Sequence, residues 1–360
     1  MIEYMSPVVI TLVSAVLFKG KDSFTARVLY MSITFGAMLV LSCLRFGVGF
    51  DYLMYSRGFF VMGMDGFSTL TYYDWEWGFT LFTKIVVYFT RDVRVYFAVV
   101  SLLCLAGPFY IVLRYSKKPW LSVLLYLNLY FFYCTTNFLR QSIAISITLF
   151  AFTFLIKRKI IPYMGIILLA AAFHITALIM VPVYLFANFK PSRKTPILYG
   201  FVILWVFIAS FPVLDILTEY MYGGYIDTVF IMQGLDAVHV VIPAAVSVLC
   251  FWFIYKFARH DKILVTYVNL IYFGAFWMVV MLRHMIIERL SYYAYIYVIL
   301  FIPEFILFLE TEPGTEKRRK AVRYGLLAVV AVVTTAYNIY GLTSGDKGVH
   351  GVYPYRSWLY

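Results

Sequence analysis

VYFAVVSLLCLAGPFYIVL, residues 95–113, contains no charged side chain. A helix needs about 20 consecutive apolar residues to cross the hydrocarbon core of a bilayer. Similar runs recur along the chain and predict spanning helices at 4–18, 28–44, 95–113, 119–135, 138–156, 195–212, 240–257, 263–282, 290–309 and 324–342. The sequence therefore predicts an all-α integral membrane protein. We expect a polytopic bundle of about 10–13 helices that forms one transmembrane domain over residues 1–360.

The composition agrees with this class, because 63% of the residues are hydrophobic and only 13% are charged. A soluble domain carries roughly a quarter charged residues. The net charge of +12 does not indicate nucleic-acid binding, because the basic residues are scattered over many short loops rather than gathered in one stripe. In the first apolar run, Lys19 and Lys21 follow the run instead of preceding it. That order predicts an uncleaved span with its N-terminus outside.

The basic residues also predict an orientation, because cytoplasmic loops of membrane proteins are enriched in Lys and Arg. If the loops 19–27, 114–118, 157–159, 190–194, 256–262 and 317–323 face the cytoplasm, they hold 20 of the 30 Lys and Arg residues. Residues 311–323 then form a basic cytoplasmic loop. The longest non-cytoplasmic loops become 45–75 and 213–239.

This orientation requires two irregular segments. Residues 76–90 cannot cross the membrane, so they must re-enter it or lie along its surface. Residues 160–188 must go in and come back as two half-helices that meet near His174. Non-helical backbone at membrane depth is tolerated only where it is buried in protein or lines a polar cavity. Both segments therefore predict a cavity on the outer side.

Ionisable and polar residues gather on this predicted outer side. Each is a candidate site residue, since such groups near a span are costly unless they face a cavity or a partner. They are Arg45, Asp51, Glu76, Asn137, Arg140, Gln141, His174, Arg283, His284, Glu288 and Arg289. None is specific alone, so the prediction rests on their clustering.

Three arginines suit a phosphate ligand. Arg140 begins an apolar helix, where free N–H groups, the helix dipole and the guanidinium all favour an anion; snorkelling to the interface is the alternative. Arg283 and Arg289 flank Glu288 and suit a diphosphate through bidentate contacts. Alternatively, Glu288 forms an ion pair with an arginine and fixes the helix ends.

His174 lies at the break in an Ala-rich segment. An imidazole titrates near neutral pH and suits a general base, although a lone His on an apolar helix is often only a packing residue. Arg45 either anchors its span at the headgroups or shapes a flexible loop with Asp51. Asp51 either contributes its carboxylate to the site or pairs with an arginine.

Several catalytic motifs are missing from the sequence. It has no Walker A motif, no G-x-S-x-G elbow and no Asp-x-Asp metal pair. No second His or carboxylate lies at helical ligand spacing from His174, so we expect no metal there. The residues favour a metal-free displacement, in which arginines neutralise a phosphate leaving group and one base activates a hydroxyl.

Five motifs, in this order, resemble the EpsG family of bacterial membrane proteins, which is grouped with the Wzy-type polysaccharide polymerases of O-antigen and exopolysaccharide synthesis. They are LRFGVGFDYLMY (44–55), EWGF (76–79), NFLRQSIA (137–144), AAFHITA (171–177) and ERLSYY (288–293). They are distributed over most of the chain. Phe50 departs from the family pattern, which usually has a small polar residue before the aspartate.

The resemblance implies a metal-independent glycosyltransferase of the hexosyltransferase type with a GT-C-like fold, in the bacterial cytoplasmic (inner) membrane. It would move a growing glycan from undecaprenyl diphosphate to the non-reducing end of an incoming lipid-linked repeat unit, on the outer face. By this resemblance Arg140, with Arg283 or Arg289, would hold the diphosphate, and His174, Asp51 or Glu76 would activate the acceptor hydroxyl. The other candidates for substrate binding are Arg45, Asn137, Gln141, Glu288 and Tyr293.

Three alternatives stay open. An O-antigen-type ligase uses the same lipid carrier, and a flippase or transporter of lipid-linked oligosaccharide also needs a cationic cavity, although it needs access from both sides. A membrane acyltransferase would use His174 with an acyl donor. The expected partners are the lipid-linked donor and acceptor, membrane lipid, a chain-length regulator and a flippase, with no cofactor and no nucleic acid.

Overall fold

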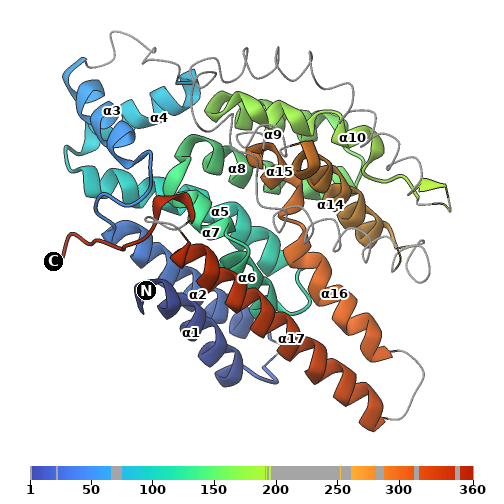
Figure 1. Ribbon diagram of the computed structural model, residues 1–360. Helices are drawn as coiled ribbons and strands as arrows, with labels where there is room; N and C mark the ends of the chain where they lie inside the picture. The colour runs from blue at the N-terminus through green and yellow to red at the C-terminus, as the bar shows by residue number, and fades with distance from the viewer. Residues whose placement is uncertain are drawn as a thin grey trace. The chain divides into compact units, whose positions relative to one another are not determined.

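The computed structural model describes residues 2–21, 23–65, 75–190, 192, 194–195, 252, 261–280, 288–311, 316–344 and 349–359. Contacts divide the chain into two units. The first contains Met1–Thr153, Ile161–Leu178 and Ile302–Tyr360, and the second contains Phe154–Ile160 and Ile179–Phe301. Within the described residues every regular element is helical, apart from one isolated antiparallel bridge between Arg45 and Ser357 (Figure 1). The all-α prediction is therefore confirmed.

Four helices of the described residues are long and apolar enough to cross a membrane. They are α2 (Phe24–Leu44), α5 (Val93–Tyr115), α8 (Leu139–Ile156) and the part Arg323–Thr343 of α17 (Glu316–Thr343). The pair α15 (Glu288–Tyr295) and α16 (Val298–Thr311), bent by 45°, adds a fifth if it is one span. The protein is thus a multi-pass membrane protein, as its apolar runs predict.

The remaining helices of the described residues are shorter. In the first unit these are α1 (Ile2–Leu17), α3 (Tyr52–Asp65), α4 (Trp77–Phe89), α6 (Pro119–Asn128), α7 (Phe131–Asn137) and the 3-10 helix η5 (Val349–Gly351). α9 (Ile160–Phe173) and the 3-10 helix η1 (Ile175–Met180) both pass from one unit to the other. The second unit contains α10 (Val183–Phe186) and α14 (Lys262–Val280). The predicted spans 195–212 and 240–257, and the loop 213–239, lie outside the described residues, save for single positions.

The predicted span 119–135 is not one continuous helix. The chain breaks between α6 and α7, where Tyr130 has a left-handed φ of 67°. Two contacts with α17 hold this break: the Tyr130 hydroxyl donates to the carbonyl of Tyr337, and the two rings lie 4.6 Å apart. Asn128, at the end of α6, forms hydrogen bonds with Thr334, Thr335 and Asn338 of α17.

Both predicted irregular segments are interrupted or short. α4 has 13 residues, fewer than the about 20 that a crossing helix needs. α9 ends at Phe173, and the chain continues past His174 as the 3-10 helix η1. The predicted break at His174 is therefore confirmed.

α5 and α8 pack closely in the first unit, where Gly107 lies against Ser146. A Cβ on Gly107 of α5 would lie 2.1 Å from the carbonyl oxygen of Ser146, so only glycine permits the approach. The Ser146 hydroxyl accepts from the Gly107 N–H at 2.8 Å and donates to the Leu103 carbonyl at 2.6 Å. It thereby enters the hydrogen-bond ladder of α5 just before Pro108.

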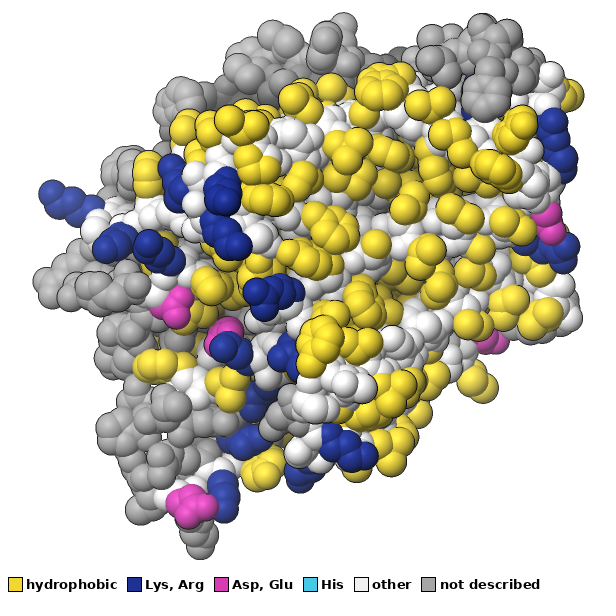
Figure 2. Space-filling view, turned by 180° about the vertical axis from the view of Figure 1, so that it is seen from behind, with side chains coloured by type: hydrophobic (Ala, Val, Ile, Leu, Met, Phe, Trp, Pro, Cys, Tyr) yellow, Lys and Arg dark blue, Asp and Glu magenta, His cyan; other side chains and the backbone are white. Residues whose placement is uncertain are grey.

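Apolar side chains cover much of the surface. Figure 2 shows hydrophobic side chains over most of one face, with Lys and Arg side chains in groups toward its edges. Leu102, Leu168 and Val332 are each more than half exposed on their helices. In a protein with spanning helices such side chains contact lipid, so their exposure does not put apolar surface into water.

Candidate functional site

Glu76 is the centre of the candidate site. It immediately precedes α4, and its two carboxylate oxygens bind different partners. Oε1 lies 2.5 Å from Nδ1 of His174 and accepts the backbone N–H of Ile175 at 3.1 Å. Oε2 accepts from Nη1 of Arg140 at 2.6 Å. Three residues that are far apart in sequence, Glu76, Arg140 and His174, therefore form one group, which we call the Glu76 triad.

A close helix contact allows Glu76 to reach the break at His174. A Cβ on Gly78 would lie 2.5 Å from the carbonyl oxygen of Ala172, so the start of α4 lies directly against the end of α9. The break in turn frees the N–H of Ile175, which a continuous helix would have used internally. The carboxylate of Glu76 takes the place of that internal partner.

Arg140 reaches the triad from the first turn of α8. The hydroxyl of Tyr55, in α3, lies 3.5 Å from the Arg140 backbone nitrogen. The guanidinium carbon of Arg140 lies 5.9 Å from the centre of the Trp75 ring. Neither aromatic residue was a candidate from sequence reasoning. Tyr55 nevertheless belongs to a quoted motif, one helical turn after Asp51. Trp75 directly precedes Glu76, the first residue of another motif.

The triad is enclosed but not sealed. The side chains of Glu76 and His174 are each 15% exposed, and that of Arg140 is 18% exposed. Burial raises the pKa of Glu76, but the hydrogen bond from His174, the charges of His174 and Arg140, and the Ile175 N–H together lower it to about 2. Glu76 is therefore ionised throughout the physiological pH range.

The arrangement suits proton transfer by His174. A carboxylate at Nδ1 favours the tautomer with a proton on that nitrogen, so that Nε2 carries the basic lone pair of the ring. The carboxylate also stabilises the imidazolium that results. The group can thus supply a general base whose orientation is fixed by Glu76.

A second group of candidates meets next to the triad, where the loop 45–51 lies against the junction of α7 and α8. The side chain of Arg45 is 1% exposed, donates to the carbonyl of Thr136 at 2.5 Å, and has its guanidinium 5.0 Å from the Phe97 ring centre. The backbone N–H of Asp51 donates to Oδ1 of Asn137 at 3.2 Å. Arg45 and Asn137 therefore hold the loop, and the loop holds Asp51 near the start of α8.

The other face of this loop is covered by residues 349–358, which we call the C-terminal strap. The Phe46 N–H donates to the carbonyl of Arg356 at 2.9 Å, and the Gly49 N–H donates to the carbonyl of Gly351 at 3.1 Å. His350 lies 3.3 Å from the thiol of buried Cys134. The sequence did not predict these contacts, because pairing over such a distance leaves no local pattern.

Replacing Gly49 by Ala is expected to lower the free energy of unfolding by about 2–4 kcal/mol. Gly49 has a φ of +97°, and a Cβ there would lie 2.4 Å from the Thr136 carbonyl oxygen. Thermal unfolding of the purified protein in detergent measures the effect. Gly47→Ala is the matched control, because Gly47 also has a positive φ (+64°) but nothing within 4 Å of its Cβ position. Equal losses for both variants would contradict the close contact.

The remaining sequence candidates are Gln141, Arg283, His284, Glu288, Arg289 and Tyr293. Gln141 is 1% exposed beside Arg140. Glu288, Arg289 and Tyr293 belong to α15 in the second unit, where the Glu288 carboxylate accepts from the Tyr292 hydroxyl at 2.6 Å and Tyr293 is fully buried. Arg283 and His284 lie outside the described residues. The diphosphate roles of Arg283 and Arg289 therefore stay predictions.

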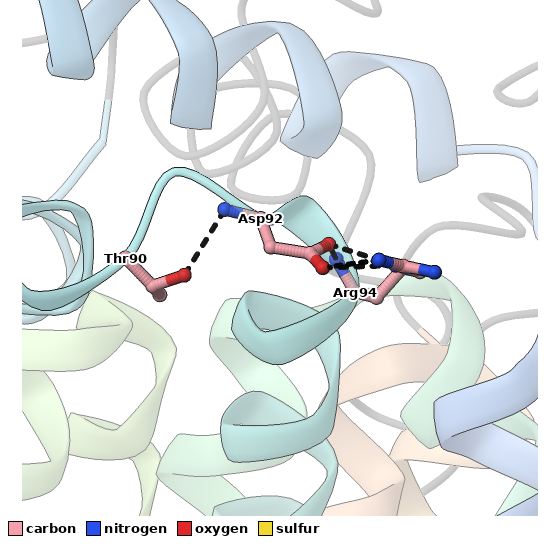
Figure 3. A network of polar contacts seen from close by, with 3 residues as sticks. All are labelled: Thr90, Asp92 and Arg94. Atoms are coloured by element: carbon pink, nitrogen blue, oxygen red, sulfur yellow. Dashed lines mark hydrogen bonds and ion pairs between the residues drawn. The ribbon is translucent and has the colours of Figure 1, made fainter.

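A different acidic residue shows what an ordinary ion pair looks like in this chain. Asp92 caps α5, accepting the Arg94 N–H at 2.8 Å, and its carboxylate pairs with the Arg94 guanidinium at 2.6 Å (Figure 3). These hydrogen bonds hold the pKa of Asp92 below its usual value. The Arg94 side chain is 60% exposed, however, and such surface pairs contribute little. This pair serves as a control for the Glu76 triad.

Comparison with protein families decides the assignment. The EpsG family model matches residues 28–357, which include the Glu76 triad, the loop 45–51 and nearly all of the C-terminal strap. The chain belongs to the EpsG family. EpsG membership indicates a role in exopolysaccharide biosynthesis and confirms the resemblance that the five motifs carry. A search among curated proteins and another among solved structures each found no match.

Proposed function

We propose that this EpsG protein is a polysaccharide polymerase, a glycosyltransferase that extends a glycan on its lipid diphosphate carrier. The observation that supports the proposal best is the Glu76 triad, which combines an oriented imidazole with a guanidinium in a partly exposed group. Transfer from a diphosphate leaving group needs both: a base for the acceptor hydroxyl and positive charge beside the departing phosphate.

In the proposed reaction, Nε2 of His174 takes the proton of an acceptor hydroxyl at the non-reducing end of the incoming unit. The oxygen attacks the anomeric carbon of the growing glycan, and the bond from that carbon to the undecaprenyl diphosphate oxygen breaks. The leaving diphosphate keeps the electron pair of that bond. Glu76 stabilises the imidazolium, and Arg140 contributes positive charge, with Arg283 or Arg289 as further candidates.

The proposed location is the outer face of a bacterial cytoplasmic membrane. The distribution of Lys and Arg over the loops supports this orientation, because it puts the motifs that contain Glu76, Arg140 and His174 at the outer side. Lipid-linked repeat units would meet the enzyme there.

The direct test is incubation of the purified protein with a defined undecaprenyl-diphosphate-linked repeat unit, followed by gel analysis. We expect a ladder of products that persists in EDTA, because the proposed chemistry uses arginines in place of a metal ion. Asp92→Asn protein should give the same ladder, and His174→Gln protein should give none. A single transfer to a different acceptor would indicate a ligase instead, and loss in EDTA that Mg²⁺ restores would contradict the metal-free mechanism.

A further inference from the structure

A cavity of about 270 Å³ lies in the second unit, and none of its lining residues belongs to the candidate site. It is bordered by the end of α8, the segment after α10 and the start of α14. Three basic residues line it: Arg158, Lys190 and Lys262. They come from three separate segments of the chain, so the fold brings their positive charges together around one hollow.

One of the three cations is held in place. The guanidinium of Arg158 donates to the carbonyl of Tyr184 and lies 4.4 Å from the centre of the Tyr184 ring. The Arg158 backbone has a left-handed φ of 55°, which a residue with a Cβ adopts only where its surroundings favour it. A guanidinium that is already fixed loses little conformational entropy when it binds an anion.

The acidic residues that line the cavity do not neutralise its three positive charges. Among the described residues that line it, Asp261 is the one acid, and its Oδ1 accepts the N–H groups of Ile263 and Leu264 at 2.8 and 3.1 Å. It caps α14 and offsets the partial positive charge of that helix end. Lys190 and Lys262 form no ion pair within the described parts of the chain, so the cavity keeps a net positive charge.

The rim of the same cavity is apolar. Leu185 and Phe189 line it, and they are 65% and 63% exposed. In a membrane protein, exposed apolar side chains next to a group of Lys and Arg mark the level where acyl chains end and headgroups begin. A soluble anion would use only the cations, whereas a lipid would use both parts of the lining.

We propose that this cavity binds a phosphate group, and that the phosphate is the headgroup of an anionic phospholipid. Arg158, Lys190 and Lys262 would bind the phosphate oxygens, and Leu185 and Phe189 would contact the start of the acyl chains. The site lies in loops to which the Lys and Arg distribution assigns the cytoplasmic side, where anionic lipids are abundant.

Native mass spectrometry of the full chain in detergent tests the proposal. Dioleoylphosphatidylglycerol and dioleoylphosphatidylcholine are titrated in turn, and inorganic phosphate is added as competitor. We expect one phosphatidylglycerol to be retained about tenfold more tightly than phosphatidylcholine, and Lys190→Gln/Lys262→Gln protein to lose this preference. Lys157→Gln/Lys159→Gln is the matched control, because it removes two charges from the same region that do not line the cavity. It should keep the preference.

Leu185→Glu is a second variant, which leaves all three cations and the Arg158–Tyr184 contact intact. It puts a negative charge at the rim of the cavity and should also weaken phosphatidylglycerol binding. Equal retention by wild type and Lys190→Gln/Lys262→Gln protein, or equal loss in the control, would overturn the site. Displacement of the lipid by millimolar inorganic phosphate would overturn the lipid as the source and assign a soluble phosphate ligand.

Discussion

Glu76→Gln protein is expected to elongate glycan at least 100-fold more slowly than wild type, while still inserting into the membrane. In the proposed reaction, the carboxylate fixes the tautomer of His174 and stabilises the imidazolium that forms when the acceptor hydroxyl loses its proton. An amide keeps the shape but provides no negative charge. The rate of ladder formation from a defined lipid-linked repeat unit measures the effect.

A double-mutant cycle separates this role from simple destabilisation. If Glu76 acts through His174, then Glu76→Gln/His174→Gln protein should be scarcely slower than His174→Gln protein. The effects of substituting residues that act as a unit are not additive. Asp92→Asn is the control, since it removes another carboxylate paired to an arginine, but at the surface. Losses that multiply in the double variant would show that the two residues act independently.

Arg140→Ala protein is expected to lose elongation as severely, and Arg140→Lys protein to recover only a small part of it. Arg140 donates to Oε2 of Glu76 while lying beside the Trp75 ring, and the compact ammonium of lysine lacks the planar fork for both. Removal of the guanidinium also leaves the enclosed Glu76 carboxylate with less positive charge, which costs about 3–5 kcal/mol for a buried pair. Elongation rate and thermal unfolding should therefore both fall.

The two measurements distinguish a structural from a catalytic contribution. At a temperature where Arg140→Lys protein is fully folded, its rate should still be at least tenfold below that of wild type. Arg94→Ala, which breaks the exposed pair with Asp92, should change neither quantity appreciably. Near-normal polymer from Arg140→Ala protein would exclude Arg140 from the reaction.

The sequence predicts the helices of the membrane domain well, because hydrophobic length is a local property. The break at His174 was also predictable, since the segment 160–188 is too long for one crossing and too short for two ordinary ones. The break at Tyr130 was not. Left-handed backbone usually coincides with glycine or asparagine, and here a tyrosine adopts it because its ring and hydroxyl bind α17, some 200 residues later.

The candidate site was also predictable from the sequence only in part. Charge distribution indicated that Glu76, Arg140 and His174 belong to one side, but it could not decide which of His174, Asp51 and Glu76 contact one another. The hydrogen bonds join Glu76 to His174 and Arg140, and the Asp51 backbone to Asn137. Arg45, a predicted substrate-binding residue, is almost fully buried. Its guanidinium binds the carbonyl of Thr136 and so holds the loop 45–51 in place.

The C-terminal strap has a consequence for biogenesis. Tyr355 bonds to the carbonyl of Leu41 across 314 residues, and Tyr4 bonds to that of Val352 across 348. The segment carrying Asp51 therefore emerges from the ribosome before the strap that bonds to its loop. Nascent chains that stall before residue 349 contain every residue of the Glu76 triad but lack the backbone hydrogen bonds from loop 45–51 to the strap. The order of synthesis therefore matters for folding: loop 45–51 is held on both faces only after α17 has been translated and the strap has bonded to it.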